Sequence, residues 1–185
     1  MDFSETLQES ITGDAFFQMQ DTGRCELVQG GGTNISPAGK HHGKIANTIG
    51  VLLTLHTKEK KLGTICAAET GIYTQRNPDT IRAPDSLFIS KEREAEISDH
   101  TKYLDVAPEL VVEVLCPNDT WTEVETKIEE YFSAGVCLVW VIDPEQEIVA
   151  VYHPTGERSR LTKTDTLTGS NVLPSFSVSI TEIFE

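Results

Sequence analysis

Basic residues are scarce in this sequence. It has 15 lysines and arginines against 29 aspartates and glutamates, which leaves a net charge of −14. Proteins that grip many phosphates usually display a basic face, so this balance argues against a simple nucleic-acid-binding protein. A nucleic-acid substrate is compatible with the acid surplus if bound metal cancels charge locally, or if the surplus lies on another face.

Long apolar runs are also absent. No stretch approaches the ~20 residues that span a bilayer. The first ten residues, MDFSETLQES, are acidic and polar and lack the apolar core of a secretory signal. We therefore expect no membrane contact and a protein that stays in the cytoplasm.

Cysteines are few and widely spaced. Cys25, Cys66, Cys116 and Cys137 form no C-x-x-C pair, and a zinc site needs ligands closer together in the sequence. We expect buried free thiols in a reducing compartment.

The hydrophobic period predicts both helices and strands, in a single domain over residues 1–185. A chain of this length suits one domain, and its 38% hydrophobic and 24% charged residues support a packed core. Helices are expected at 12–20, 42–60 and 120–133, and strands at 24–29, 65–74, 81–90, 109–116, 137–143 and 148–153.

Two connections predict how the strands pair. The turn Asn77-Pro78-Asp79 predicts an antiparallel hairpin between the strands that precede and follow it. The strand–helix–strand order from residue 109 to residue 143 predicts a parallel pair. The expected fold class is therefore α/β, with a mixed β-sheet flanked by helices.

Glu113 is an acidic residue inside an otherwise apolar strand. The run ELVVEVLC, residues 109–116, is nearly continuous in apolar residues, which predicts a central strand buried on both faces. An unpaired carboxylate there would cost several kcal/mol. A metal ion, a basic partner or a raised pKa must compensate for it. A strand-end carboxylate paired with an arginine is the structural interpretation.

Asp85 is a second carboxylate among apolar neighbours, directly after Pro84 in the stretch IRAPDSLFI. On its own it has a simpler interpretation as a turn or capping residue. Together with Glu113 on an adjacent strand, it forms a site for a hard cation such as Mg²⁺ or Mn²⁺.

Lys127 lies on the helix that the capping box Thr120-Trp121-Thr122-Glu123 opens and Gly135 closes. The helical period places it beside Val124 and Tyr131, at the border of the apolar stripe. A snorkelling lysine is the structural interpretation. The functional interpretation is an ammonium near the metal, which orients a water or stabilises charge developing on phosphorus.

Three stretches of the sequence carry a family resemblance: APDSLFI, PELVVEVLCPND and EVETKIEEYFSAGVCLVWVIDP. They resemble the Uma2 (DUF820) family, which is grouped with the PD-(D/E)XK nucleases. The similarity runs from the strand at RCELVQG to the region Ile148–Pro154, and the K-I-x-E-Y and W-V-I-D-P runs make it more specific than the two acids alone. The resemblance implies a restriction-endonuclease-like fold and a metal-dependent endonuclease that hydrolyses phosphodiester bonds in nucleic acid, with DNA as the expected substrate and Mg²⁺ or Mn²⁺ as the cofactor.

The resemblance also implies further site residues. Glu26 matches a family acid, and its alternative is an ordinary strand-edge carboxylate. His42 resembles a recurring family histidine, at a helix N-terminus that favours an anionic phosphate. Glu69 is expected in the strand before Asp85, facing the same site or simply solvated. The backbone carbonyl of Val114 is expected as a third protein ligand of the metal.

One position departs from the parent motif, which has lysine two residues after the second acid. Leu115 stands there, and the Uma2-like pattern places the lysine on the following helix, as Lys127. Lys40, Lys44 and Arg82 are further candidates for phosphate contacts, or are solvated side chains.

Oligomeric state and two rival functions complete the expectations. A homodimer is expected, because many nucleases of this type cut two strands with two copies of one site. One rival is a degenerate nuclease fold that binds a partner without cutting, which Leu115 and the acidic surface favour. The other is a structural oligomeric protein with Glu113 in a buried ion pair.

Overall fold

The computed structural model describes residues 10–19 and 23–185, so residues 1–9 of the segment considered for a secretory signal lie outside it. Within the described ranges, every helix is too short or too polar to cross a membrane. The helices are α1 (Gly13–Gln18), α2 (Lys40–Lys60), α3 (Lys91–Glu94), α4 (Trp121–Ala134) and α5 (Ile180–Phe184). The strands are β1 (Cys25–Val28), β2 (Gly31–Asn34), β3 (Gly63–Ala67), β4 (Ile72–Gln75), β5 (Thr80–Arg82), β6 (Ser86–Ser90), β7 (Leu110–Val114), β8 (Leu138–Asp143), β9 (Ile148–Tyr152), β10 (Arg158–Leu161), β11 (Thr166–Gly169) and β12 (Leu173–Ser179).

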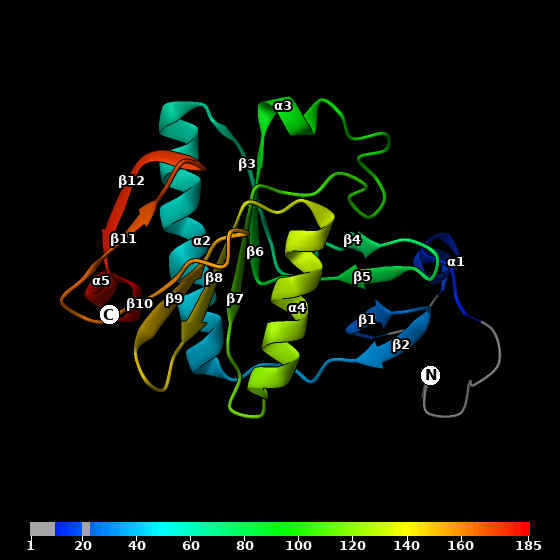
Figure 1. Ribbon diagram of the computed structural model, residues 1–185, viewed down its shortest axis with the longest axis horizontal. Coiled ribbons are helices and arrows are strands. Elements are labelled where there is room, and N and C mark those ends of the chain that lie inside the picture. Colours follow the sequence, from blue (N-terminus) through cyan, green and yellow to red (C-terminus); the bar gives the residue numbers. More distant parts are fainter. Residues whose placement is uncertain (1–9, 20–22) are drawn as a thin grey trace.

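A mixed sheet of order β10-β9-β8-β7-β6-β3 forms the centre of the described molecule (Figure 1). β7 lies in its interior, antiparallel to β6 and parallel to β8. The fold class, the parallel pair and the central place of the Glu113 strand are therefore confirmed. The helix between β7 and β8 also has the predicted ends, with a Thr120–Glu123 capping box and Gly135 in the left-handed conformation.

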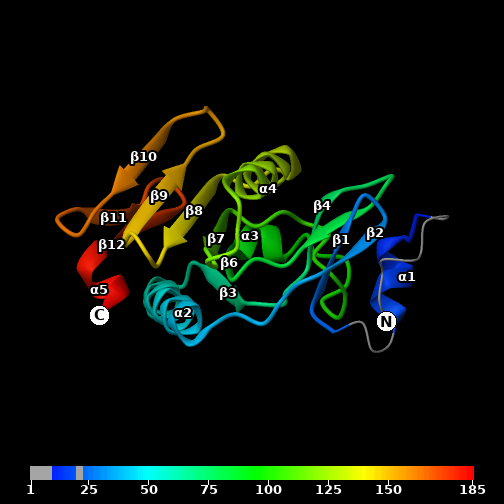
Figure 2. The same cartoon turned by 90° about the horizontal axis from the view of Figure 1, so that it is seen from below.

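The two long helices cover opposite faces of this sheet (Figure 2). Side chains alternate along β7, so Leu110, Val112 and Val114 pack toward α2 while Val111 packs toward α4. Glu113 follows the same alternation and faces α4. Glu113 is therefore an acidic side chain beside the apolar cluster between β7 and α4, one residue before β7 ends.

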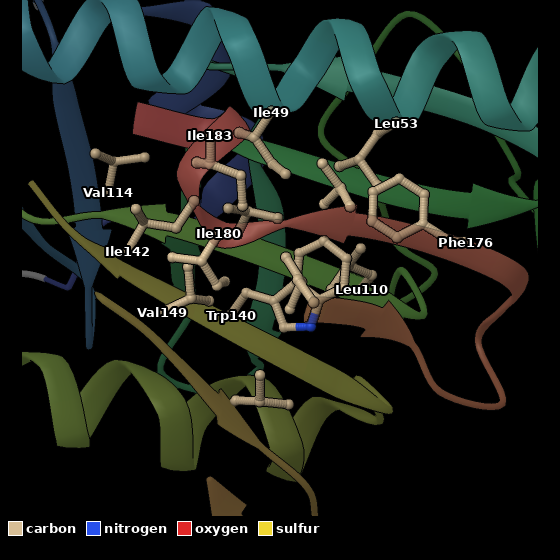
Figure 3. Close-up of a cluster of buried hydrophobic side chains, with 14 of the residues drawn as sticks. Ile49, Leu53, Leu110, Val114, Trp140, Ile142, Val149, Phe176, Ile180 and Ile183 are labelled. Atoms are coloured by element: carbon tan, nitrogen blue, oxygen red, sulfur yellow. The ribbon is translucent and has the colours of Figure 1, made fainter. Parts of the chain in front are cut away.

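The face of the sheet under α2 holds a large apolar cluster (Figure 3). Ile49 and Leu53 of α2 meet Trp140 of β8 and two elements from the C-terminal region, β12 through Phe176 and α5 through Ile183. The β11–β12 hairpin and α5 were not predicted. They seal the cluster and hold the helix that carries His42, since the Lys44 ammonium also hydrogen-bonds the backbone oxygen of Phe184 at 3.2 Å.

The predicted hairpin around Asn77-Pro78-Asp79 is antiparallel, but it divides between two sheets. β3 pairs with β6 in the central sheet, whereas β4 pairs with β5 in a second sheet of order β2-β1-β5-β4. The expected continuous strand 65–74 is wrong because Glu69 has φ of 75°, which turns the chain. Pro84 interrupts the other arm, because proline has no N–H to donate to a ladder.

Each of the four cysteines, all within the described residues, is a thiol outside any disulfide, as expected. Their expected burial is wrong, since all four are partly exposed. Each lies at an element end or at a sheet position that the two large apolar clusters do not cover completely.

Candidate active site

Asp85 lies in the link between β5 and β6, and its carboxylate points to the end of β7. Oδ2 of Asp85 accepts a hydrogen bond from the backbone N–H of Val114 at 2.8 Å. Val114 directly follows Glu113, so this bond brings the two predicted acids to the same strand end. Their side chains are 11% and 13% exposed, respectively.

His42 lies in the first turn of α2 and meets the same carboxylate, with Nε2 3.2 Å from Oδ2 of Asp85. The hydrogen bond to Asp85 raises the pKa of His42, against the effect of burial, and a hydrogen bond to the Val114 carbonyl adds to the rise. The Val114 carbonyl therefore faces the same corner as the Asp85 carboxylate. We call Asp85, Glu113 and His42 the acidic corner.

Glu113 accepts a hydrogen bond from the hydroxyl of Tyr131, a fully buried residue of α4. Burial raises the pKa of Glu113 to about 7, and the negative charges of Asp85 and Glu26 act in the same direction. Lys127 and the Tyr131 hydroxyl oppose the rise without cancelling it. A carboxyl group that titrates near neutral pH is typical of a functional site.

Lys127 reaches inward from α4, where its Nζ lies 3.3 Å from Oε1 of Glu26 and 3.7 Å from Oε1 of Glu113. Burial alone would lower the pKa of Lys127, but the charges of Glu113 and Glu26 outweigh it and the pKa is raised. The amine is therefore a fixed positive charge between two carboxylates. The partner of Glu113 is a lysine and not the arginine of the structural interpretation, but an ion pair here fits the purely structural rival as well as the metal site, so it does not separate the two.

Glu26 is 3% exposed and is compensated on all sides. It accepts hydrogen bonds from Arg82 Nη1 at 2.8 Å and from the backbone N–H of Ala83 at 3.1 Å. Burial raises the pKa of Glu26, but Lys127, Arg82 and the Ala83 bond outweigh burial, so the pKa is lowered. The interpretation of Glu26 as an ordinary strand-edge carboxylate is wrong, because β1 lies between β2 and β5 and the side chain is buried against Arg82 and Lys127.

Arg82 joins Glu26 to the helix above it. Its guanidinium holds Glu130 of α4 with two bonds, Nε to Oε2 at 2.6 Å and Nη2 to Oε1 at 2.9 Å. Arg82 is only 7% exposed, so neither solvation nor a phosphate contact accounts for it. We call Glu26, Arg82 and Glu130 the ionic network.

The sequence analysis did not single out Glu130 or Tyr131, although a signal for them exists. Lys127, Glu130 and Tyr131 stand at positions i, i+3 and i+4 of α4 and therefore share one helix face. Once Lys127 is assigned to the site, this spacing assigns its two neighbours as well.

Glu69 is not among the residues that these contacts bring together. It lies in the turn between β3 and β4, its side chain is 69% exposed, and its described ion pair is with Arg24 at 3.3 Å. The positive φ at Glu69 directs the carboxylate away from the strand position at which it was expected.

The donors at the acidic corner suit a hard divalent cation. Within residues 10–19 and 23–185, no three His, Cys, Asp or Glu side chains are grouped to hold a metal ion. Mg²⁺, however, keeps several waters and usually takes one or two carboxylates from the protein. Asp85 and Glu113, with the carbonyl of Val114, provide such a set.

The arrangement of sheet and helices has a close counterpart among solved structures. A crystal structure from Anabaena variabilis ATCC 29413, described as a putative nuclease belonging to DUF820, superimposes with a TM-score of 0.79 at 20% sequence identity, over 94% of this chain and 97% of the other. At that identity the likeness shows a nuclease-like fold.

The sequence places the chain in a family. Residues 14–181 match the sequence model of the Uma2 family, whose description is "putative restriction endonuclease", and the chain belongs to that family. A search of curated proteins found no match.

Proposed function

We propose that the protein is a metal-dependent endonuclease that hydrolyses phosphodiester bonds in nucleic acid, with DNA as the expected substrate. The observation that carries the proposal is the meeting of Asp85 and Glu113 at the end of β7 beside the Lys127 amine. The family description and the nuclease-like fold support the same class of reaction.

The acidic corner would hold one Mg²⁺ or Mn²⁺ ion through Asp85, Glu113 and the carbonyl of Val114. Such an ion, when bound, polarises a phosphoryl oxygen and lowers the pKa of a coordinated water. The raised pKa of Glu113 supports this assignment, because burial and the neighbouring carboxylates disfavour its ionised form more than Lys127 and Tyr131 favour it, and a bound cation would offset that cost.

Lys127 supplies the remaining charge of the proposed mechanism. Its ammonium lies on the Glu113 side of the corner, where it stabilises negative charge as it develops on the phosphorus oxygens. Oε1 of Glu26 lies 3.3 Å from Nζ of Lys127 and helps to hold the amine in place. This placement answers the departure at Leu115, since an amine from the following helix reaches the carboxylate that the usual lysine would accompany.

His42 has a positioning role in the proposed mechanism. It links α2 to Oδ2 of Asp85, the oxygen that also accepts the Val114 N–H, and so orients the carboxylate with its other oxygen left for the cation. The position of His42 in the first turn of α2 also puts free helix N–H groups beside the corner, which favours an anionic phosphate there.

A cleavage assay with supercoiled, linear duplex and single-stranded DNA in Mn²⁺ tests the proposal. Wild type should cut at least one of these, and Asp85→Asn should reduce the rate by orders of magnitude, because uncatalysed phosphodiester hydrolysis is very slow. Asp79→Asn is a matched control, an acid that lies in the β4–β5 turn and binds the N–H of Gly13. Binding without cutting by wild type would favour the degenerate nuclease fold instead.

A thermal shift with Mn²⁺ separates both functions from a purely structural protein. The proposal requires Mn²⁺ to raise Tm in wild type and to leave Asp85→Ala unchanged, because ligands that bind only the folded state stabilise it. Equal responses in the two proteins would leave no role for the acidic corner. Sedimentation of the wild type, with and without DNA, tests the expected homodimer.

A further inference from the structure

α2 and its flanks are the basic part of an acidic chain. From Leu27 to Ala68 the sequence has a single acid, Glu59, against five lysines: Lys40, Lys44, Lys58, Lys60 and Lys61. The whole chain carries −14. A polyanion approaching this protein therefore meets a favourable local potential along this helix.

Two of these lysines share one side of α2. Lys40 and Lys58 stand at the two ends of a series with spacing i, i+7, i+11, i+14 and i+18, which lies on one face of an α-helix. The members between them are neutral and short: Asn47, Val51 and Thr54. Lys44 is excluded from the argument because its ammonium binds the backbone oxygen of Phe184.

This side of α2 borders a groove of about 300 Å³. The other wall is β3, an edge strand of the central sheet, through Ile65 and Ala67. Asp85 is the only charged residue of the lining, so the groove leads directly into the acidic corner. Continuity with that corner makes the groove part of the approach to the proposed reaction centre.

Gly50 makes the groove deep at the middle of α2. A Cβ placed on Gly50 meets no described atom within 4 Å, so packing within the chain does not require glycine there. Glycine inside a helix is destabilising relative to alanine. What glycine provides is close approach of another molecule to the helix backbone.

We propose that the groove between α2 and β3 binds the sugar–phosphate backbone of one nucleic-acid strand beside the scissile bond, with Lys40 and Lys58 each contacting a phosphate. The inference rests on the proposed function and names the surface that holds its substrate. At ~1.5 Å per residue the two lysines are ~27 Å apart along the helix, so they contact phosphates several nucleotides apart on the same strand. Phosphate contacts carry no base information, so binding here is independent of sequence.

A second copy of the chain is the competing occupant. Two-fold packing of α2 against its symmetry mate would be isologous, so an antiparallel pair would place Lys40 of one copy beside Lys58 of the other. Like charges at both ends disfavour that dimer, whereas a phosphate backbone satisfies both lysines.

Fluorescence anisotropy with a labelled 20-nucleotide DNA, single-stranded and duplex, tests the inference without divalent metal. In Lys40→Gln/Lys58→Gln we expect at least about tenfold weaker binding, and a salt dependence shallower by about 1.5 in the slope of log K against log salt. Lys102→Gln should change neither. Lys102 pairs with Asp14 of α1 at 3.1 Å, and α1 is well separated from α2 in both views (Figures 1 and 2).

Gly50 offers a matched pair of variants at one position. Gly50→Ala and Gly50→Leu should both keep or raise Tm, because each removes a helix-interior glycine. Only leucine fills the groove, so only Gly50→Leu should weaken DNA binding, by about tenfold. A loss of stability in parallel with binding would indicate a structural role and overturn the inference.

The outcomes separate this inference from the proposed function. Lysine-dependent binding by a protein that never cuts would overturn the nuclease and keep the groove. Cutting that is indifferent to the lysine and Gly50→Leu changes would keep the nuclease and overturn the groove. A change in sedimentation of Gly50→Leu, with DNA binding intact, would assign the groove to a second copy.

Discussion

The ionic network and the acidic corner are adjacent, and they shift the pKa of a buried glutamate in opposite directions. In the network, Glu26 is 3% exposed and its pKa is lowered, since Lys127 and Arg82 outweigh the cost of burial. In the corner, Glu113 is 13% exposed and burial raises its pKa to about 7. Burial acts against ionisation of both acids, but two cations and a backbone N–H outweigh it at Glu26, whereas one lysine and the Tyr131 hydroxyl do not outweigh it at Glu113.

This difference indicates what each group of residues is for. The network joins β1, β5 and α4 with mutually satisfied charges, which suits a scaffold. The corner has two carboxylates at the end of β7, with His42 on Asp85 and the Lys127 amine on Glu113, and the proposed cation would complete its charge. Lys127 contacts one carboxylate of each, Glu26 in the network and Glu113 in the corner, so its variants should disturb both.

Breaking the network should have the largest effect on stability. We expect Arg82→Met to lower the free energy of unfolding by about 3–5 kcal/mol, because it leaves the buried Glu26 and the partly buried Glu130 without their shared cation. Urea denaturation measures the change. Arg158→Met, at an exposed position of β10, is the matched control and should stay near wild type. Equal stabilities of the two variants would contradict a structural role for the network.

Replacing the shared amine should act mainly on chemistry. Lys127→Met should reduce the cleavage rate by about 10²–10³, with a smaller effect on KM for DNA than on kcat. Lys127→Arg keeps the charge but spreads it over a planar fork, so we expect partial recovery. Full activity of Lys127→Met in Mn²⁺ would remove the amine from the mechanism and leave it in the network alone.

The main elements that form the network and the corner could be predicted from local sequence signals. The apolar run around Glu113 predicted a central strand, the capping box and Gly135 predicted both ends of α4, and the helical period turned Lys127 inward. Each signal depends on residues within a few positions of one another. Physical constraints at that range, such as strand burial and helix capping, act before tertiary packing does.

Contacts between residues far apart in the sequence could not be predicted from such local signals. Arg82 looked like one of several scattered basic residues, because its partners Glu26 and Glu130 are 56 and 48 positions away. Tyr131 looked like part of an apolar stripe, and only the structure shows that its hydroxyl donates a hydrogen bond to Glu113. The predicted strand position of Glu69 was wrong because its positive φ turns the chain there. Glutamate has no preference for that conformation, so the sequence does not indicate the turn.

Removing the charge of Glu113 should stabilise the protein. Its pKa is raised from 4.5 to about 7, so the folded state binds more protons than the unfolded state between those values. Stability contributed by this group therefore falls as pH rises through that window and is lowest above pH 7. Glu113→Gln, which mimics the protonated acid, should gain on the order of 2 kcal/mol at pH 8 and little at pH 5.

A glutamate of the ionic network is the control, because its replacement should change the stability in the opposite direction. Glu130→Gln should lose stability at pH 8, because it weakens a paired charge beside Arg82. If Glu113→Gln and Glu130→Gln both destabilise at pH 8, the two groups of residues do not differ as proposed.

Metal binding should show the smallest and most specific effect, a proton release from the corner. A cation requires Glu113 ionised, so the apparent Mn²⁺ affinity should fall by up to about tenfold for each pH unit below 7. The raised pKa of His42, held by its hydrogen bond to Asp85, acts with the same sign, since a protonated imidazole opposes a cation beside it. The Mn²⁺-dependent shift in Tm, measured from pH 5.5 to pH 8.5, should grow with pH in wild type. Asp85→Asn should show no shift at any pH, whereas a wild-type affinity that is flat across pH 7 would mean that Glu113 is not a ligand and that its charge is balanced by Lys127 alone.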